Sequence, residues 1–126
     1  MKITAFNPLI VTKEADSTIK LFEKLGFEKK HLKENEVNDI DVSTVRMKDS
    51  NGFHVDVSKV PVPKDMVVIR MNVDDFEEAK AILVKRGFVN QNAGQKVETD
   101  SSYSEFMVSP SGFAIDLIKH VKKEDA

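Results

Sequence analysis

Two short segments carry the side chains that could do chemistry. Residues 52–57 read GFHVDV and residues 112–117 read GFAIDL. Carboxylates and imidazoles can bind divalent metals or transfer protons. In a strand, His54 and Asp56 would share one face, with Cα atoms roughly 7 Å apart, and Asp116 would stand at the matching position of the second segment. These segments therefore mark the first place to look for a site.

The two segments belong to an internal repeat. Residues 24–27 read KLGF and residues 85–88 read KRGF, at nearly the same separation as the first pair. Two landmarks at one separation indicate two copies of one unit. We expect a single domain over residues 1–126, with the first repeat at 1–60, the second at 64–119 and a polar tail at 120–126. Two prolines at 61 and 63 suit a connector.

Each copy predicts a strand, a helix and three further strands, that is, a βαβββ unit. The helices are expected to start at Asp16 or Ser17 and at Asp74 or Asp75, and to end at Gly26 and Gly87. Residues 34–41 are polar and predict a loop. The strands are expected at 3–11, 27–32, 42–48 and 53–58, then at 66–73, within 88–100, at 104–108 and at 113–119.

Alternation along these strands predicts which face each side chain takes. The apolar set should pack on the helices, namely Phe53, Val55, Val57, Val67, Ile69, Met71, Val73, Phe113, Ile115 and Leu117. The opposite face then carries acids, an arginine, a histidine and amides. We expect an α+β fold whose two repeats pair their edges into one curved mixed sheet around a concave pocket, the default place for a ligand.

Composition excludes several classes of protein. The 19 basic and 21 acidic residues give a net charge of −2, and no basic face suggests nucleic acid as a partner. There is no Cys, so disulfides and thiolate chemistry are excluded. No apolar run approaches the length of a membrane span, and the first residues do not resemble a signal peptide. We expect a cytoplasmic protein with no membrane partner.

The duplicated βαβββ pattern resembles the vicinal oxygen chelate superfamily, which includes glyoxalase I, bleomycin-resistance proteins and extradiol dioxygenases. The resemblance rests on residues 18–22 (TIKLF) before LGF at 25–27 and on the two turn-Gly-Phe-x-x-acid strands. It implies four metal-ligand positions, which fall at Asn7, Asp56, Val68 and Asp116. Asn7 is a poor ligand and Val68 has no donor. A divalent metal would therefore depend on Asp56 and Asp116, with His54 as a third ligand.

Each candidate also has a structural interpretation. Asp56 and Asp116 fit either a ligand site or inherited carboxylates hydrogen-bonded to neighbours. His54 is better explained as a pocket wall than as a ligand or base. Arg70 fits two roles equally well: it could be the structural partner of an acid, or it could anchor a ligand carboxylate or phosphate. Tyr103 is expected either to rim the pocket or to cap the edge of its strand, with the rim preferred, whereas His31 and His120 are expected on the surface.

Three functions remain open on these residues. The first is a small-molecule binding protein of the bleomycin-resistance type, with no cofactor and, by resemblance, a homodimer. The second is a metal-dependent enzyme, similar to lactoylglutathione lyase or to a dioxygenase, that uses Asp56, Asp116 and His54. The third is an interaction domain that binds a peptide or another chain. The expected ligand-binding residues are Asn7, His54, Asp56, Arg70, Asn72 and Asp116.

Overall fold

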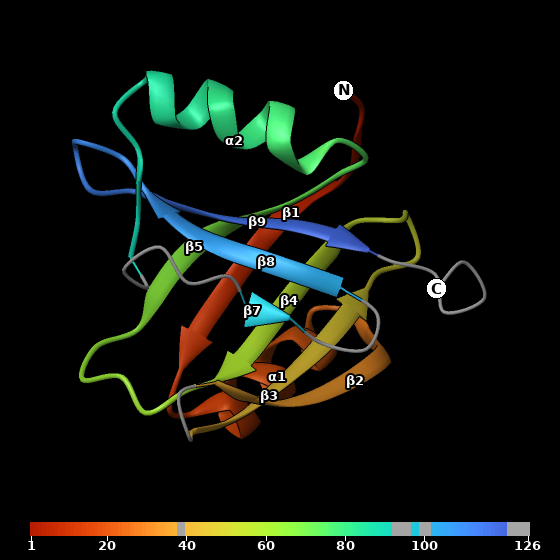
Figure 1. The fold of residues 1–126 in the computed structure, drawn as a ribbon. Coiled ribbons are helices and arrows are strands. Elements are labelled where there is room, and N and C mark those ends of the chain that lie inside the picture. The colour runs from red at the N-terminus through yellow and green to blue at the C-terminus, as the bar shows by residue number, and fades with distance from the viewer. Residues whose placement is uncertain (38–39, 92–96, 99–101, 121–126) are drawn as a thin grey trace. The chain divides into compact units, whose positions relative to one another are not determined.

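The computed structural model describes residues 1–37, 40–91, 97–98 and 102–120. It is an α+β fold with one helix in each βαβββ repeat, which confirms the predicted fold class (Figure 1). The elements are β1 (Ile3–Thr12), α1 (Ala15–Lys24), β2 (Glu28–Val37), β3 (Ile40–Lys48), β4 (His54–Lys59), β5 (Met66–Val73), α2 (Phe76–Lys85), β6 (Val89–Asn90), β7 (Val97–Glu98), β8 (Ser102–Val108) and β9 (Ala114–His120).

The chain forms two compact units. One consists of residues 7–68, and the other of residues 1–6 together with 69–126. We call them the 7–68 unit and the 69–126 unit. In the described residues, no helix has the length and apolar character of a membrane span.

The 7–68 unit is a mixed sheet with α1 on one face. Its strand order is β2-β3-β4-β1, in which β1 and β4 run parallel and the other pairs antiparallel. Ala15 of α1 packs with Val45 and Met47 of β3 and with Val55 and Val57 of β4. This apolar cluster fixes which face of β3 and β4 turns away from the helix.

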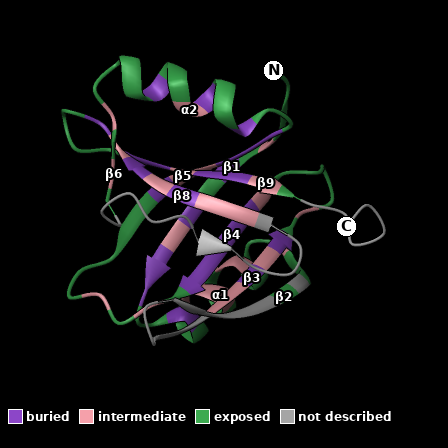
Figure 2. Ribbon diagram, in the orientation of Figure 1, coloured by how far each residue is buried: buried purple, intermediate pink, exposed green. Residues whose placement is uncertain are grey.

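The 69–126 unit repeats this arrangement. Its strand order is β5-β9-β8-β6, with β7 also paired to β8 and with β5 and β9 parallel. The buried side of α2 lies against the sheet (Figure 2). Phe76, the largest fully buried side chain among those that the structure describes, meets the Tyr103 ring edge to face at 5.0 Å between centroids. The other buried members of this cluster are Met71, Val73, Ala79, Leu83, Met107, Ile115 and Leu117.

Helix ends follow the sequence signals in part. Asp75 caps α2 by accepting a 3.0 Å hydrogen bond from the Glu78 amide, as predicted. Gly87 ends this helix at a φ of +92° that a side chain rarely adopts. The predicted cap of α1 at Asp16 or Ser17 is wrong, because both residues lie inside the helix and Glu14 stands at its start without a side-chain cap.

Three expectations about strands and faces are also wrong. Most of residues 34–41, predicted as a loop, extend β2 and β3, which pair from Glu28–Lys48 out to Val37–Ile40. Residues 38 and 39 lie outside the described residues. Phe53 and Phe113 precede their strands and are 67% and 54% exposed, so neither packs under a helix. Val67 is 71% exposed, near the start of β5, before the buried part of that strand.

An ion pair with a buried carboxylate lies on the helix side of the 69–126 unit. Glu105 of β8 is 1% exposed, Lys80 Nζ of α2 lies 3.1 Å from its Oε2, and Asn90 Nδ2 donates to its Oε1. Ile19 and Val45 occupy the corresponding positions of the first repeat. A carboxylate at this depth is tolerated only while its partners remain.

We predict that Lys80→Ile alone lowers the free energy of unfolding by about 1–3 kcal/mol, because it leaves a buried carboxylate without its cation. Lys80→Ile with Glu105→Val, which copies the first repeat, should recover most of that loss. Urea unfolding followed by circular dichroism measures both. A double variant that is less stable than the single one would contradict the ion-pair explanation.

Candidate functional site

The 7–68 unit buries a carboxylate on the sheet face opposite α1. Since Val55 and Val57 pack under α1, Asp56 between them points to the other face, where it is 0% exposed. Asp56 lies opposite Leu9 of β1, and Asn7 precedes Leu9 on the same face. Asn7 is 5% exposed and its Nδ2 donates to the Pro8 carbonyl at 2.9 Å. Its buried Oδ1 accepts no hydrogen bond from a described residue, so it could accept one from a ligand.

Arg46 also lies on this face, although its orientation could not be predicted from the sequence. Val45 and Met47 lie in the cluster under α1, so Arg46 turns away from the helix and stands opposite Asp56 in the β3–β4 register. The hydroxyls of Thr44 and Ser58, next along the same two strands, are 2.7 Å apart. The uneven alternation of residues 42–48 hid this arginine. Its only sequence signal was its place between two apolar residues.

His54 lies on the same face as Asp56, at the beginning of β4. Burial lowers the pKa of His54 below its usual 6.5, and the positive charge of Arg46 lowers it further. A hydrogen bond with the Met47 backbone and the charge of Asp56 oppose this shift. The imidazole is therefore biased toward its neutral form, which suits a hydrogen-bonding pocket wall.

The 69–126 unit carries an arginine on the face opposite α2. Met71 and Val73 pack under α2, which turns Arg70 and Asn72 the other way. Arg70 Nε donates to Oδ1 of the buried Asn72 at 3.1 Å, and Arg70 Nη2 lies 3.4 Å from His120 Nε2. Asp116 is the residue opposite Arg70 in the parallel β5–β9 register. This guanidinium is held beside an amide and an imidazole.

The six predicted site residues thus fall into two groups. Asn7, His54 and Asp56 share one face of the 7–68 unit, and Arg70, Asn72 and Asp116 share one face of the 69–126 unit. The prediction that one pocket uses all six remains a prediction.

Other expectations were less accurate. The predicted rim position of Tyr103 is wrong, because its ring packs on Phe76 under α2. His120 is exposed as predicted, and it also contacts Arg70. The side chain of His31 lies outside what the structure describes. Glu105, whose orientation was not predicted, faces α2 and so lies away from both polar faces.

The ligand positions that the superfamily resemblance implies do not fit a transition metal well. Val68 offers no donor atom, and Asn7 offers only an amide. Asp116 lies opposite the cation of Arg70, which competes with a metal for its carboxylate. In the part of the chain with described side chains, no three His, Cys, Asp or Glu residues cluster as a metal site would require. Two aspartates are a weak donor set for metals that prefer imidazole.

Comparison by sequence finds no match. No protein family profile matches the chain, and no curated protein is significantly similar to it.

Comparison by structure finds a clear likeness. A glyoxalase/bleomycin resistance protein/dioxygenase superfamily member from Vibrio splendidus 12B01 is 15% identical, with a TM-score of 0.62, over 95% of this chain and 100% of that one. Methylmalonyl-CoA epimerase from Mycobacterium tuberculosis is 13% identical, with a TM-score of 0.71, over 98% and 92%. A methylmalonyl-CoA epimerase in complex with methylmalonyl-CoA and NH4+ is 15% identical, with a TM-score of 0.66, over 94% and 95%.

These likenesses define the class of fold. The chain has a glyoxalase-like fold, and the resemblance seen in the sequence is confirmed at the level of the fold. A shared fold does not transfer a reaction, because function depends on the particular site.

Lowering the pH from about 7 to about 5 should destabilise the native protein through His54. Its native pKa lies below the unfolded value of 6.5, so between the two values the unfolded chain binds a proton that the native chain does not. His54→Gln removes this contribution to the pH dependence of stability. Its melting temperature should therefore fall less over this pH range than that of the unmodified protein, as measured by differential scanning calorimetry. Equal falls would show that His54 does not titrate in this way.

Proposed function

We propose that the protein binds a small organic anion, without a metal, at the sheet faces that point away from the helices. The observation that supports this most directly is the positioning of Arg70 by the buried Asn72 and by His120. Arg70, Asn72 and Asp116 form this site in the 69–126 unit, and Asn7, His54 and Asp56 form the corresponding polar face of the 7–68 unit.

Arginine is the residue best suited to this task. A guanidinium has five N–H donors in a rigid plane, which matches the two oxygens of a carboxylate or phosphate. Its hydrogen bond to Asn72 fixes the side chain before a ligand arrives, which reduces the entropy lost on binding. On the polar face of the 7–68 unit, the mainly neutral imidazole of His54 and the amide of Asn7 are uncharged hydrogen-bonding groups of the kind that orient a ligand.

The fold neighbours support this class of ligand by analogy. One neighbour is solved in complex with methylmalonyl-CoA, which carries a free carboxylate beside a thioester. The analogy concerns the fold and the kind of molecule, and it transfers no residue role to this chain. The homodimer implied by the resemblance stays a prediction, which light scattering coupled to size-exclusion chromatography tests directly.

Anion binding should depend on Arg70. A thermal-shift screen of small dicarboxylates and phosphate esters should yield ligands that raise the melting temperature by several degrees, because a ligand of the native state stabilises it. Arg70→Ala should abolish that rise, and Arg70→Lys should retain a part of it. Arg86→Ala is the matched control, since Arg86 is exposed at the end of α2. An undiminished rise in Arg70→Ala would remove Arg70 from the site.

Metal titration separates this proposal from the enzyme alternative. We expect Ni²⁺, Zn²⁺, Mn²⁺ and Fe²⁺ to bind no more tightly than about 1 mM by calorimetry, because the donor set lacks imidazoles at the ligand positions. Asp56→Ala and Asp116→Ala should leave any residual affinity unchanged. Micromolar binding lost in both variants would instead favour a metal-dependent enzyme that uses Asp56, Asp116 and His54.

A further inference from the structure

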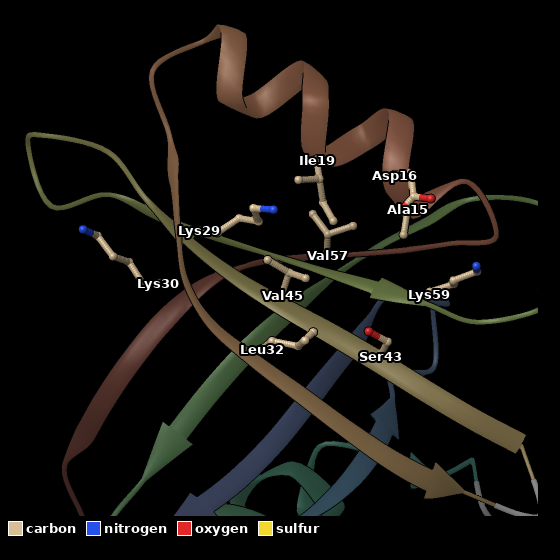
Figure 3. Close-up of a pocket in the computed structure, with 10 residues that line it drawn as sticks. All are labelled: Ala15, Asp16, Ile19, Lys29, Lys30, Leu32, Ser43, Val45, Val57 and Lys59. Atoms are coloured by element: carbon tan, nitrogen blue, oxygen red, sulfur yellow. The ribbon is translucent and has the colours of Figure 1, made fainter.

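A pocket lies on the other side of the 7–68 unit, between α1 and the sheet. Its volume is about 480 Å³, within the range of pockets that hold small ligands. Figure 3 shows Ile19 pointing from α1 toward Val57 and Val45 on the sheet, which form the apolar centre of the pocket. Because this is the helix face, the pocket is distinct from the polar face that carries Asp56.

The second repeat shows what normally fills this space. Its helix begins with Phe76 where α1 begins with Ala15. On the sheet, Tyr103 pairs with Lys119 in the register in which Ser43 pairs with Lys59. In the 69–126 unit, the two rings pack edge to face between helix and sheet. In the 7–68 unit, Ala15 and Ser43 leave the corresponding volume open.

The residues that line the pocket walls also differ between the two repeats. The positions of Ile19 and Val45 hold Lys80 and Glu105 in the second repeat, where they form an ion pair whose carboxylate is buried. The first repeat therefore has an apolar surface where the second repeat has an ion pair. An apolar surface beside an open pocket can bind an aromatic ring.

Lysines surround this apolar centre. Lys29 and Lys59 line the pocket from different strands, and neither pairs with a carboxylate among the side chains that the structure describes. Lys30 pairs with Glu28 at 3.2 Å, and Asp16 is the one acid in the lining. The cations outnumber the acid, so the charge favours an anion.

A bulge in β2 brings two of the lining residues to the same side. Lys29 lies opposite Met47 and Leu32 opposite Val45, with the pairing shifted by one residue between Lys29 and His31. Regular alternation would place residues 29 and 32 on opposite faces. The bulge turns both toward the pocket, an arrangement that often accompanies a site.

We propose that this pocket is a second ligand site, which binds an aromatic carboxylate. The ring of the ligand occupies the space that Phe76 and Tyr103 fill in the other repeat. Its carboxylate pairs with Lys59 or Lys29. The pocket shares no residue with the proposed anion site on the polar faces, so each proposal can be tested without the other.

The probe is 2-naphthoate, with 2-naphthalenemethanol as its neutral match. In methyl-detected NMR of the full chain, naphthoate should shift the Ile19, Val45 and Val57 methyl signals in a saturable way, and the alcohol should bind about tenfold more weakly. Lys59→Gln should lower naphthoate affinity several-fold. Lys20→Gln, on an exposed position of α1 outside the lining, should leave it unchanged.

Filling the pocket gives the second arm of the test. Ala15→Phe, which introduces the ring of the second repeat, should abolish the naphthoate-dependent shifts, and Ser43→Tyr should weaken them. Circular dichroism establishes that each variant is folded. Shifts that persist in a folded Ala15→Phe variant would overturn the proposal. Methyl signals that do not move in the unmodified protein would also overturn it. So would equal affinities for naphthoate and the alcohol, together with a naphthoate affinity that Lys59→Gln does not change.

Discussion

The structure depends on the burial of one side of each sheet beneath a helix. Val45, Met47, Val55 and Val57 pack under α1, and Met71, Met107 and Leu117 pack under α2. Burying these side chains contributes about 1.5–3 kcal/mol each and sets the register, because a shift of one residue would exchange the two faces. Every polar residue of the proposed anion site takes its orientation from this constraint. Asp56 lies between two buried valines, and Arg70 precedes the buried Met71.

Sequence reasoning predicted the parts of the fold that rest on repetition and on local chemistry. The duplicated Gly-Phe turns gave the two βαβββ repeats, and Asp75 was expected at the start of α2. The prediction of a loop at residues 34–41 was wrong, because a polar sequence suits a hairpin as well as a loop. Sequence reasoning also could not orient Arg46 or Glu105, because both occur in strands whose apolar and polar residues do not alternate cleanly. Their faces became clear only from the strand register.

The two repeats share a backbone pattern and differ in how they fill the layer between helix and sheet. The second repeat closes this layer with the Phe76 and Tyr103 rings and the Lys80–Glu105 pair. The first places small or aliphatic residues at the same four positions, and a pocket of about 480 Å³ remains. The duplication therefore provides an internal comparison, in which one half shows the closed form of the space that the other half leaves open.

The central claim is that the side chains directed away from the helices, with Arg70 foremost, bind an anionic ligand. The most direct measurement is the NMR signal of each arginine Nε–Hε group during titration with a carboxylate identified by thermal shift. The Arg70 signal should change in a saturable way, with little change at the exposed Arg86. A ligand that binds and stabilises the protein while the Arg70 signal stays fixed would contradict the central claim.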